Sequence, residues 1–435
     1  MTAVVSAAAE VLERERKQFE ARTPRSRERF QRALEVFPGG DTRIATFYHP
    51  YPVAIERAEG IDLVDLDGNH YADFLLNYTS LITGHRHPEV MAAAAEAMSR
   101  LTGVAAPVPG QVELAEELVR RVPSVERVRF TNSGSESTLI AVWAARAFTG
   151  RPVLVKAIGG YHGCVPELDR GLRDDAFPPG LPDQTPIRAV PFNDPGALRA
   201  AIDEAGDSLA AVLLEPVLGS GGVIAPEPGY LEQAREWTQD AGALLVFDEV
   251  ITFRLSRGGY QAIAGLEPDL TAFAKIIGGG FPVGAVGGRA AVMDVFRPGG
   301  ERSISHSGTF NGNPVTVAAG LKVLELLDDA AYAKLDGLGA KLARGLREAI
   351  ERTGVAAQVT HVGSLLNVHF ATEPVRDFDA VQAGDAVATA AFHLGLMNRG
   401  VFVAPRGMLA LATVTEESDV QKVVDAAADV FAELA

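Results

Sequence analysis

Two patterns of hydrophobic and polar positions alternate along most of the chain. From about residue 88, short continuous apolar runs are separated by segments whose apolar residues recur about every three or four positions. The first pattern is typical of strands buried on both faces, and the second is typical of amphipathic helices. The predicted strands cover residues 128–130, 153–155, 212–214, 244–247 and 270–273, and the predicted helices include 90–98 and 230–240. Such alternation predicts an α/β fold in which helices cover a mostly parallel central sheet.

The two ends of the chain lack this alternation. The elements expected there are a charged helix over 8–37, short strands within 52–76 joined by a turn at Asp67-Gly68, helices from Pro314 to about 352, a strand over 365–370, a helix over 382–398, a strand over 401–403 and a helix over 416–434. We therefore expect an N-terminal segment over 1–75 that contributes to a small domain, a large domain over 76–325 and a C-terminal small α+β domain over 326–435.

Composition narrows the class of protein. The chain has 435 residues, a net charge of −16 and one cysteine, Cys164. A diffuse negative charge argues against nucleic acid or an anionic membrane as a partner, and a single cysteine excludes an internal disulfide. The N-terminus has no basic stretch followed by an apolar one, and no apolar run has the length of a membrane span. We therefore expect a cytoplasmic protein whose partners are small molecules.

One acidic stretch has a spacing similar to that of a calcium-binding loop. Asp65, Asp67 and Asn69 alternate as the first ligands of such a loop would. Gly68, however, falls one place early, and Leu76 stands where the loop needs a glutamate. We therefore predict no metal site.

Two predicted strands end in residues of opposite charge. Asp248 ends one apolar run, and Lys275 ends the next one before a glycine-rich stretch. In α/β sheets, ligands bind at the carboxyl ends of the strands. Pyridoxal 5′-phosphate (PLP) needs such a pair, because a lysine forms a Schiff base with its aldehyde and a carboxylate keeps its pyridine nitrogen protonated. Each residue alone has an ordinary alternative, a solvated lysine or a carboxylate that caps a helix.

A third feature fits the phosphate of the same cofactor. The stretch Asn132-Ser-Gly-Ser-Glu136 follows a predicted strand and opens a helix. Backbone N–H groups at such a helix start favour an anion, the hydroxyls of Ser133 and Ser135 could bind it, and Gly134 lets the backbone approach closely. The alternative is a common serine N-cap without a ligand.

Further candidates lie near the same strand ends. Tyr161 could stack on the pyridine ring, with His162 beside it, and Val250 could contact the opposite face of the ring. Glu215 ends another predicted strand and could support the residues around the ring. Thr309 could supply another hydroxyl to the phosphate. Each of these residues could equally belong to the core or to a turn.

Together these motifs resemble those of the class III PLP-dependent aminotransferases of fold type I. The resemblance runs from about residue 30 to the end of the chain. It looks closest to the branch that holds β-amino acid (β-phenylalanine) aminotransferases and glutamate-1-semialdehyde aminomutases. The matching motifs are Asn132-Ser-Gly-Ser-Glu136, Gly160-Tyr-His-Gly163, Val246-Phe-Asp-Glu-Val250, Lys275-Ile-Ile-Gly-Gly-Gly280 and Ser307-Gly-Thr-Phe-Asn311.

The resemblance implies roles for the candidate residues. Lys275 would bond covalently to PLP, Asp248 would pair with the pyridine nitrogen, and the residues named above would contact the ring and the phosphate. Thr309 would reach the phosphate from the partner subunit. The family therefore implies a homodimer with shared active sites.

Two arginines indicate the substrate class. Arg43 follows Pro38-Gly-Gly-Asp-Thr42, and Arg406 lies in Val403-Ala-Pro-Arg-Gly407. Both stretches resemble those in which β-phenylalanine aminotransferases bind substrate carboxylates, and the planar fork of arginine suits a carboxylate. Surface arginines without a ligand are the alternative. We predict a ping-pong transfer of the amino group from a β-amino acid, such as β-phenylalanine, to 2-oxoglutarate or pyruvate.

Two other functions stay open. Glutamate-1-semialdehyde 2,1-aminomutases of this branch carry a long Gly/Ser-rich lid after the Tyr-His-Gly motif, whereas residues 164–178 are charged and have no such run. Their Pro-Gly-Gly-Val-Asn-Ser-Pro-Val-Arg pattern is also absent before Arg43. A non-catalytic PLP-binding protein of the same fold would be expected to lack Lys275, Asp248 or the phosphate turn, and the chain has all three.

Overall fold

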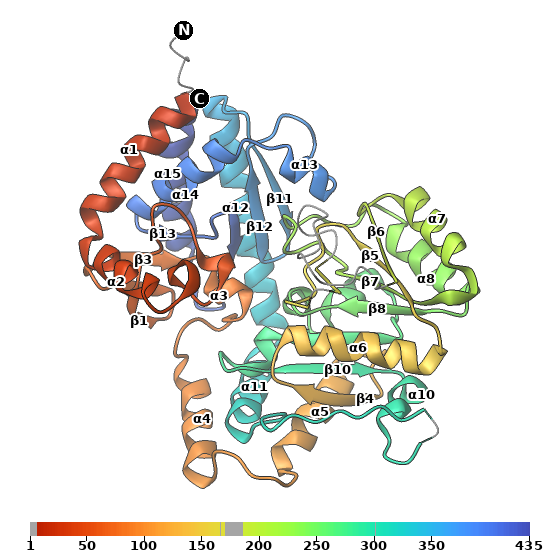
Figure 1. Ribbon diagram of the computed structural model, residues 1–435. Helices are drawn as coiled ribbons and strands as arrows, with labels where there is room; N and C mark the ends of the chain where they lie inside the picture. Colours follow the sequence, from red (N-terminus) through yellow and green to blue (C-terminus); the bar gives the residue numbers. More distant parts are fainter. Residues whose placement is uncertain (1–6, 166, 170–185, 301) are drawn as a thin grey trace. The chain divides into compact units, whose positions relative to one another are not determined.

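The computed structural model describes residues 7–165, 167–169, 186–300 and 302–435, and the chain divides into two units (Figure 1). The unit that we call the sheet unit consists of Pro88–Tyr332 and Arg376–Asp379. The other, which we call the terminal unit, consists of Met1–His87, Ala333–Val375 and Ala380–Ala435. Both ends of the chain therefore belong to one unit. The domain limits expected after residues 75 and 325 stay a prediction.

A seven-stranded sheet forms the centre of the sheet unit. Its strands, in spatial order, are β4 (Arg127–Thr131), β10 (Gly284–Gly288), β9 (Leu270–Ala274), β8 (Leu244–Asp248), β7 (Leu209–Leu214), β5 (Val153–Ala157) and β6 (Ile187–Val190). Strand β10 pairs antiparallel with both of its neighbours, and every other pair is parallel. All residues of β7, β8 and β9 are buried, which explains their continuous apolar sequences. The predicted mostly parallel sheet is confirmed.

The sequence patterns missed two strands, β6 and β10. Strand β10 reads Gly-Ala-Val-Gly-Gly, and glycine weakens any strand prediction. The structure shows why Gly284 is needed there. A Cβ atom at Gly284 would lie 2.2 Å from both the Ser133 carbonyl oxygen and Thr131 Oγ1. This glycine therefore lets the chain just after β4 lie directly against the sheet.

Helices pack against this sheet. They are α4 (Pro88–Arg100), α5 (Pro109–Arg121), α6 (Gly134–Thr149), α7 (Pro195–Ala205), α8 (Tyr230–Asp240), α9 (Gly259–Ala264), α10 (Ala290–Met293) and α11 (Pro314–Leu326). Helix α6, yellow in Figure 1, packs on β9 and β10, while α7 packs on β5 and β6, and α8 on β7 and β8. The α8 bounds agree with the predicted helix over 230–240.

The terminal unit holds two smaller sheets. The first consists of β1 (Ile55–Glu59), β2 (Asp62–Asp65), β3 (His70–Asp73) and β13 (Val401–Phe402), and the second of β11 (Gln358–Val362), β12 (Leu365–His369) and β14 (Met408–Ala410). Its helices are α1 (Ala7–Arg22), α2 (Pro24–Leu34), α3 (Leu76–Thr79), α14 (Ala386–Asn398) and α15 (Glu417–Leu434). Helix α12 (Asp329–Thr353) begins in the sheet unit, and α13 (Phe378–Gln382) spans the second division between the units.

The predicted single helix over residues 8–37 is wrong in one respect, because it is broken at Thr23. Pro24 begins α2, and a proline disfavours a helical conformation in the residue before it. The acidic turn near residue 67 caps this second helix. Asp67 accepts hydrogen bonds from the N–H groups of Arg25 (2.8 Å) and Ser26 (3.1 Å). Asp65 accepts those of Asp67 (2.9 Å) and Asn69 (2.8 Å), so backbone donors occupy the oxygens of the calcium-like stretch.

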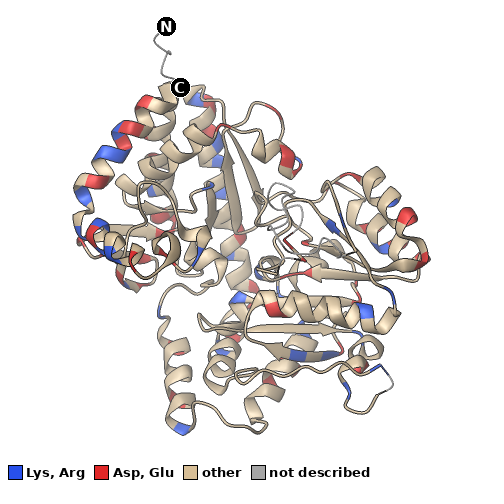
Figure 2. Cartoon of the chain, in the orientation of Figure 1, with Lys and Arg blue, Asp and Glu red and all other residues tan. Residues whose placement is uncertain are grey.

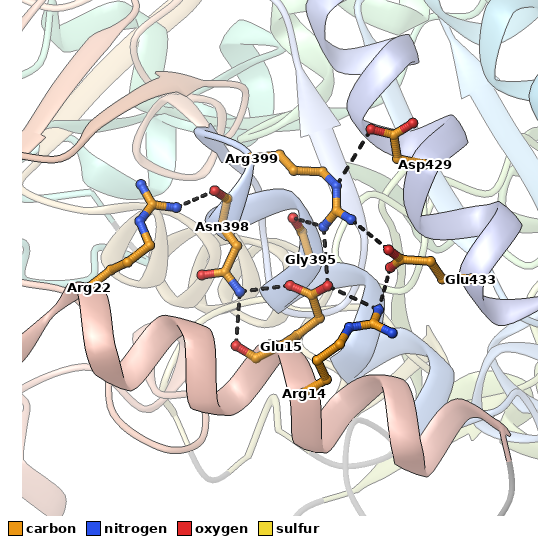
Figure 3. A network of polar contacts seen from close by, with 8 residues as sticks. All are labelled: Arg14, Glu15, Arg22, Gly395, Asn398, Arg399, Asp429 and Glu433. Atoms are coloured by element: carbon orange, nitrogen blue, oxygen red, sulfur yellow. Dashed lines mark hydrogen bonds and ion pairs between the residues drawn. The ribbon is translucent and has the colours of Figure 1, made fainter.

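Charged residues of both signs are interspersed on the surface helices, as Figure 2 shows for α1. A network of polar contacts ties this helix to the C-terminal helices of the terminal unit (Figure 3). Among the described residues, no helix combines the length and the apolar character that crossing a membrane requires.

Candidate active site

The predicted acid and lysine lie at the same edge of the seven-stranded sheet. Asp248 is the last residue of β8 and pairs with Ala272 of the parallel strand β9. Lys275 follows β9 directly, with a φ of 50°, a left-handed conformation that is uncommon outside glycine. Asp248 is buried and Lys275 is half-buried. Such a strained residue at a strand end is typical of functional sites.

The phosphate turn meets the same strand ends. Ser133 is the N-cap of α6, and its Oγ accepts a hydrogen bond from the N–H of Glu136 at 3.2 Å. A Cβ atom at Gly134 would lie 3.1 Å from Cγ1 of Val250 and 3.5 Å from Cβ of Ala274. The start of α6, the residue before Lys275 and Val250 are therefore immediate neighbours, as the sequence predicted for a common site.

The loop after β5 closes against the same helix start. Gly163 has a φ of 105°, and a Cβ atom there would lie 2.5 Å from the Cα of Ser135. The N–H of Cys164 donates to Ser135 Oγ at 3.3 Å. Only glycine can bring this loop so close to the phosphate turn.

A histidine orients the Asp248 carboxylate. His162 Nδ1 lies 2.8 Å from one carboxylate oxygen of Asp248, and the N–H of Val250 donates to the other at 3.0 Å. Burial lowers the pKa of His162, so the ring is neutral and Nδ1–H is the donor. Its Nε2 has no partner in the described part of the chain, and a Cβ atom at Gly160 would lie 2.8 Å from it.

A buried glutamate holds the backbone of Tyr161. Glu215 accepts hydrogen bonds from the N–H groups of Tyr161 (2.9 Å) and Gly219 (3.0 Å). Burial and the nearby charge of Asp248 raise the pKa of Glu215 to about 7, although Lys275 opposes this shift. The Tyr161 side chain is 37% exposed. The ring is therefore accessible while its backbone is fixed.

Sequence reasoning missed Lys156, which lies inside β5. Its side chain is buried, and Nζ donates to the carbonyl oxygens of Gly160 at 3.0 Å and Leu168 at 2.8 Å. Burial lowers the pKa of Lys156 to about 8, against the raising effect of Glu215 and other acids. Its one sequence signal is a charged residue within the apolar run Val153–Ala157. This lysine fixes both ends of the segment that carries Tyr161 and His162.

These residues fit PLP. The N-terminus of the long helix α6 offers N–H groups and hydroxyls to a phosphate, and Gly134 leaves the space that a side chain would fill. A buried carboxylate with two donors suits the protonated pyridine nitrogen, and Lys275 suits the aldehyde. Thr309 is exposed, and no contact among the described residues joins it to this cluster.

The two candidate arginines lie in the terminal unit, where one short turn contacts both. Arg43 Nη1 donates to Oδ1 of Asn77 at 3.0 Å, and the Arg406 guanidinium lies 5.3 Å from the centre of the Tyr78 ring. Arg406 Nε is buried without a hydrogen-bond partner. Neither arginine forms an ion pair with a carboxylate within the described ranges. Both guanidinium groups thus keep donors for an anionic ligand.

Comparisons with known proteins agree with this geometry. A family model described as aminotransferase class-III matches residues 44–430. A glutamate-1-semialdehyde 2,1-aminomutase of Methanothermobacter thermautotrophicus is 40% identical over 94% of this chain and 99% of its own length.

Two solved structures show the same fold. An omega-transaminase from Sphaerobacter thermophilus is 40% identical, with a TM-score of 0.90 over 94% of this chain and 97% of its own. A β-phenylalanine aminotransferase from Variovorax paradoxus is 37% identical, with a TM-score of 0.92 over 97% of both chains. Identity alone does not choose between mutase and transaminase. The family is clear at the coarser level: the chain belongs to the class III aminotransferases, enzymes that use PLP.

Proposed function

We propose that this enzyme transfers the amino group of a β-amino acid, an aromatic one such as β-phenylalanine, to 2-oxoglutarate or pyruvate. The observation that carries this proposal is the pair Arg43 and Arg406, which contact consecutive residues of one turn and have no carboxylate partner among the described residues. A ping-pong reaction binds two carboxylate substrates in turn. Paired guanidinium groups without an internal acid suit that task.

The cluster at the strand ends would carry the chemistry. Bound PLP takes up the electron pair that remains when the carbon bearing the amino group loses its proton. Lys275 Nζ is the group that removes this proton and later returns it to the other carbon. Asp248, held by His162 and Val250, keeps the proton on the pyridine nitrogen. The start of α6 holds the phosphate.

We propose further that the active enzyme is a homodimer in which Thr309 contacts the phosphate bound by the partner chain. Thr309 is exposed, and the next residue, Phe310, is a large apolar side chain that is 66% exposed. An exposed phenylalanine beside a polar segment is typical of a protein interface. The proposed interface would cover Phe310 and bring Thr309 to the second site.

An aminomutase is the second candidate, favoured by the name of the Methanothermobacter relative. An enzyme of that kind must keep its intermediate bound between two half-reactions. The charged sequence over 164–178 lacks the Gly/Ser-rich run of the lid that serves this purpose, and most of it lies outside the described residues. We therefore favour two separate half-reactions.

Spectroscopy distinguishes the two. We would add 3-amino-3-phenylpropanoate to the purified PLP form without any oxo acid and follow the visible absorbance. Conversion of the cofactor to its amine form, reversed by 2-oxoglutarate, would support the proposal. Conversion by glutamate-1-semialdehyde or by an α-amino acid alone would keep the aminotransferase family and reject the β-amino acid.

A further inference from the structure

The turn that contacts both arginines has an unusual backbone. Leu76, Asn77, Tyr78 and Thr79 all have positive φ angles, of 54°, 49°, 52° and 74°. Asn77 and Tyr78 also have ψ angles of 55° and 54°, so the chain forms a left-handed turn without a glycine. Left-handed residues of this kind normally occur singly, because Cβ approaches the following carbonyl oxygen. Four in succession persist only where the surroundings hold them in place.

A buried aspartate holds the start of this turn. Asp73 Oδ1 accepts hydrogen bonds from the N–H groups of Leu75 and Leu76, both at 2.8 Å. Its Oδ2 lies 2.7 Å from Nε2 of His85. The Leu76 side chain is completely buried and anchors the turn in the core. The strain is therefore supported from inside the terminal unit.

The turn is also fixed against the strand that follows Arg406. Helix α3, the turn itself, packs on β14, and the Ala410 N–H donates to the Phe74 carbonyl oxygen at 2.6 Å. Only Met408 and Leu409 lie between this β14 residue and Gly407. The distance from the turn to Arg406 is thus set by backbone hydrogen bonds.

The exposed side of the turn contacts both arginines. The Asn77 oxygen accepts a hydrogen bond from Arg43, and the Tyr78 ring lies against the Arg406 guanidinium. The Tyr78 hydroxyl donates to the carbonyl oxygen of Ala45, in the turn that follows Arg43. Burial raises the pKa of Tyr78, while the charges of Arg406 and Arg43 both oppose the shift, so both charges lie near its hydroxyl.

Neutral partners of this kind orient an arginine without neutralising it. A carboxylate would hold a guanidinium more strongly, but it would compete with a substrate carboxylate for the same N–H groups. The acid nearest in sequence, Asp41, is occupied by its own loop, where it accepts from the N–H of Thr42 at 2.6 Å and from the Thr46 hydroxyl. An amide oxygen and a ring face leave the positive charges in place.

We infer that the left-handed turn Leu76–Thr79 is the positioning element of the carboxylate site. Asn77 and Tyr78 fix the two arginines at a set spacing and keep their donors available. This inference rests on the proposed function, in which Arg43 and Arg406 bind substrate carboxylates. Asn77 and Tyr78 are positioning residues, because they act through the arginines.

The test introduces a competing charge at the turn. Asn77→Asp keeps the size of the side chain and tolerates the left-handed backbone, but it places a carboxylate beside Arg43. Asn77→Gly is the matched control, because it keeps the backbone and removes the side chain. We would measure the Kd of 3-phenylpropanoate for the holoenzyme by calorimetry, and the KM and kcat for 3-amino-3-phenylpropanoate.

Asn77→Asp is expected to weaken 3-phenylpropanoate and to raise KM by about tenfold, with kcat and the PLP absorbance band little changed. Asn77→Gly should shift both by only about twofold to threefold. Tyr78→Leu, which removes the ring and the hydroxyl, should weaken binding more than Tyr78→Phe, which keeps the ring.

Two outcomes separate the inference from the proposed function. If Arg43→Gln and Arg406→Gln weaken 3-phenylpropanoate while Asn77→Asp and Tyr78→Leu do not, the arginines bind carboxylates and the positioning role is wrong. If neither arginine variant changes binding, or the wild-type enzyme binds no carboxylate, the proposed substrate site is wrong and the positioning role falls with it.

Discussion

Asp248 shows how neighbouring groups fix one carboxylate at the end of a strand. It is almost fully buried and accepts one hydrogen bond at each oxygen, from His162 and from Val250. A buried carboxylate without donors is costly, so these two contacts determine where its oxygens point. Because His162 is neutral, it orients Asp248 without cancelling its charge.

Replacing Asp248 with asparagine separates charge from shape. The new side chain would keep an oxygen toward Val250, but an amide does not hold a proton on a pyridine nitrogen. We expect Asp248→Asn to retain PLP and to lower kcat by about a hundredfold or more, measured by steady-state kinetics and visible absorbance. Lys275→Ala is the control and should abolish turnover. A kcat for Asp248→Asn within about threefold of wild type would show that the proposed role is wrong.

Lys156 predicts a pH dependence of stability. Burial lowers its folded pKa to about 8 from an ordinary value of 10.5. Between these two pH values the unfolded chain binds more protons at this residue than the folded one, so the free energy of unfolding rises with pH. Below pH 8 the cost of burying the charge is fully present.

Lys156→Met removes this dependence, and wild type and variant would be unfolded in guanidinium chloride at pH 7.5 and 9.5. We expect wild type to gain on the order of 1–2 kcal/mol relative to the variant over this range. Leu154→Met, in the same strand without a charge, is the control. Parallel pH curves for wild type and Lys156→Met would contradict the shifted pKa.

At this scale, the sequence indicated the residues whose signal is local. Asp248 and Lys275 end apolar runs, and the phosphate turn opens a helix, so strand ends and spacing were enough to place them together. The contacts of Lys156 with Gly160 and Leu168, and the left-handed turn at Leu76, depend on how distant segments pack. No periodicity or propensity reports such contacts.

The elements show the same division. Strands with continuous apolar sequences, such as β7, β8 and β9, were found from pattern alone. Strand β10 was missed because its glycines serve close packing against the chain after β4, which is a tertiary requirement. The break at Thr23 could have been predicted, because Pro24 marks it in the sequence.

Helix α1 depends on a buried acid. Glu15 is 1% exposed, and its Oε2 accepts from Asn398 Nδ2 at 2.7 Å. Its Oε1 lies 3.3 Å from Arg399 Nη1, and Arg399 also pairs with Glu433 of α15 (Figure 3). These contacts join α1 to α14 and α15. Removing one member of a buried ion pair leaves the others without compensation.

Glu15→Ala is therefore expected to lower the free energy of unfolding by about 2–4 kcal/mol, measured by urea denaturation. Glu13→Ala is the matched control on the same helix. Glu13 is exposed and pairs with Arg16 and Lys17 within α1, so its loss should have a much smaller effect. Equal effects of the two substitutions would mean that the network does not stabilise the unit.

On the scale of the whole molecule, each unit is assembled from separate stretches of chain. The terminal unit contains the first 87 residues together with the C-terminal segment, and the sheet unit lies between them in sequence. The cofactor residues Asp248 and Lys275 belong to the sheet unit, and both candidate arginines belong to the terminal unit. Sequence patterns showed which stretches differ in character, but the pairing of β3 with β13, far apart in the chain, comes only from the structure.

The proposed homodimer gives the last prediction. If Phe310 lies in the interface, Phe310→Glu places a charge among apolar groups and should prevent association. Wild type should sediment at twice the 46.0 kDa chain mass, and the variant at the mass of one chain. Because Thr309 would then be withdrawn from the partner's phosphate, the variant should also bind PLP more weakly and lose activity.

Ile263→Glu is the control, since Ile263 is also a large apolar side chain, 55% exposed, on α9. It should remain dimeric and active. Thr309→Ala tests the shared site separately, because it leaves Phe310 intact. We expect it to stay dimeric while its affinity for PLP falls by about tenfold, measured by titration of the apoenzyme. A dimeric Phe310→Glu with normal PLP affinity would place the interface elsewhere, and a Thr309→Ala with unchanged affinity would remove Thr309 from the cofactor site.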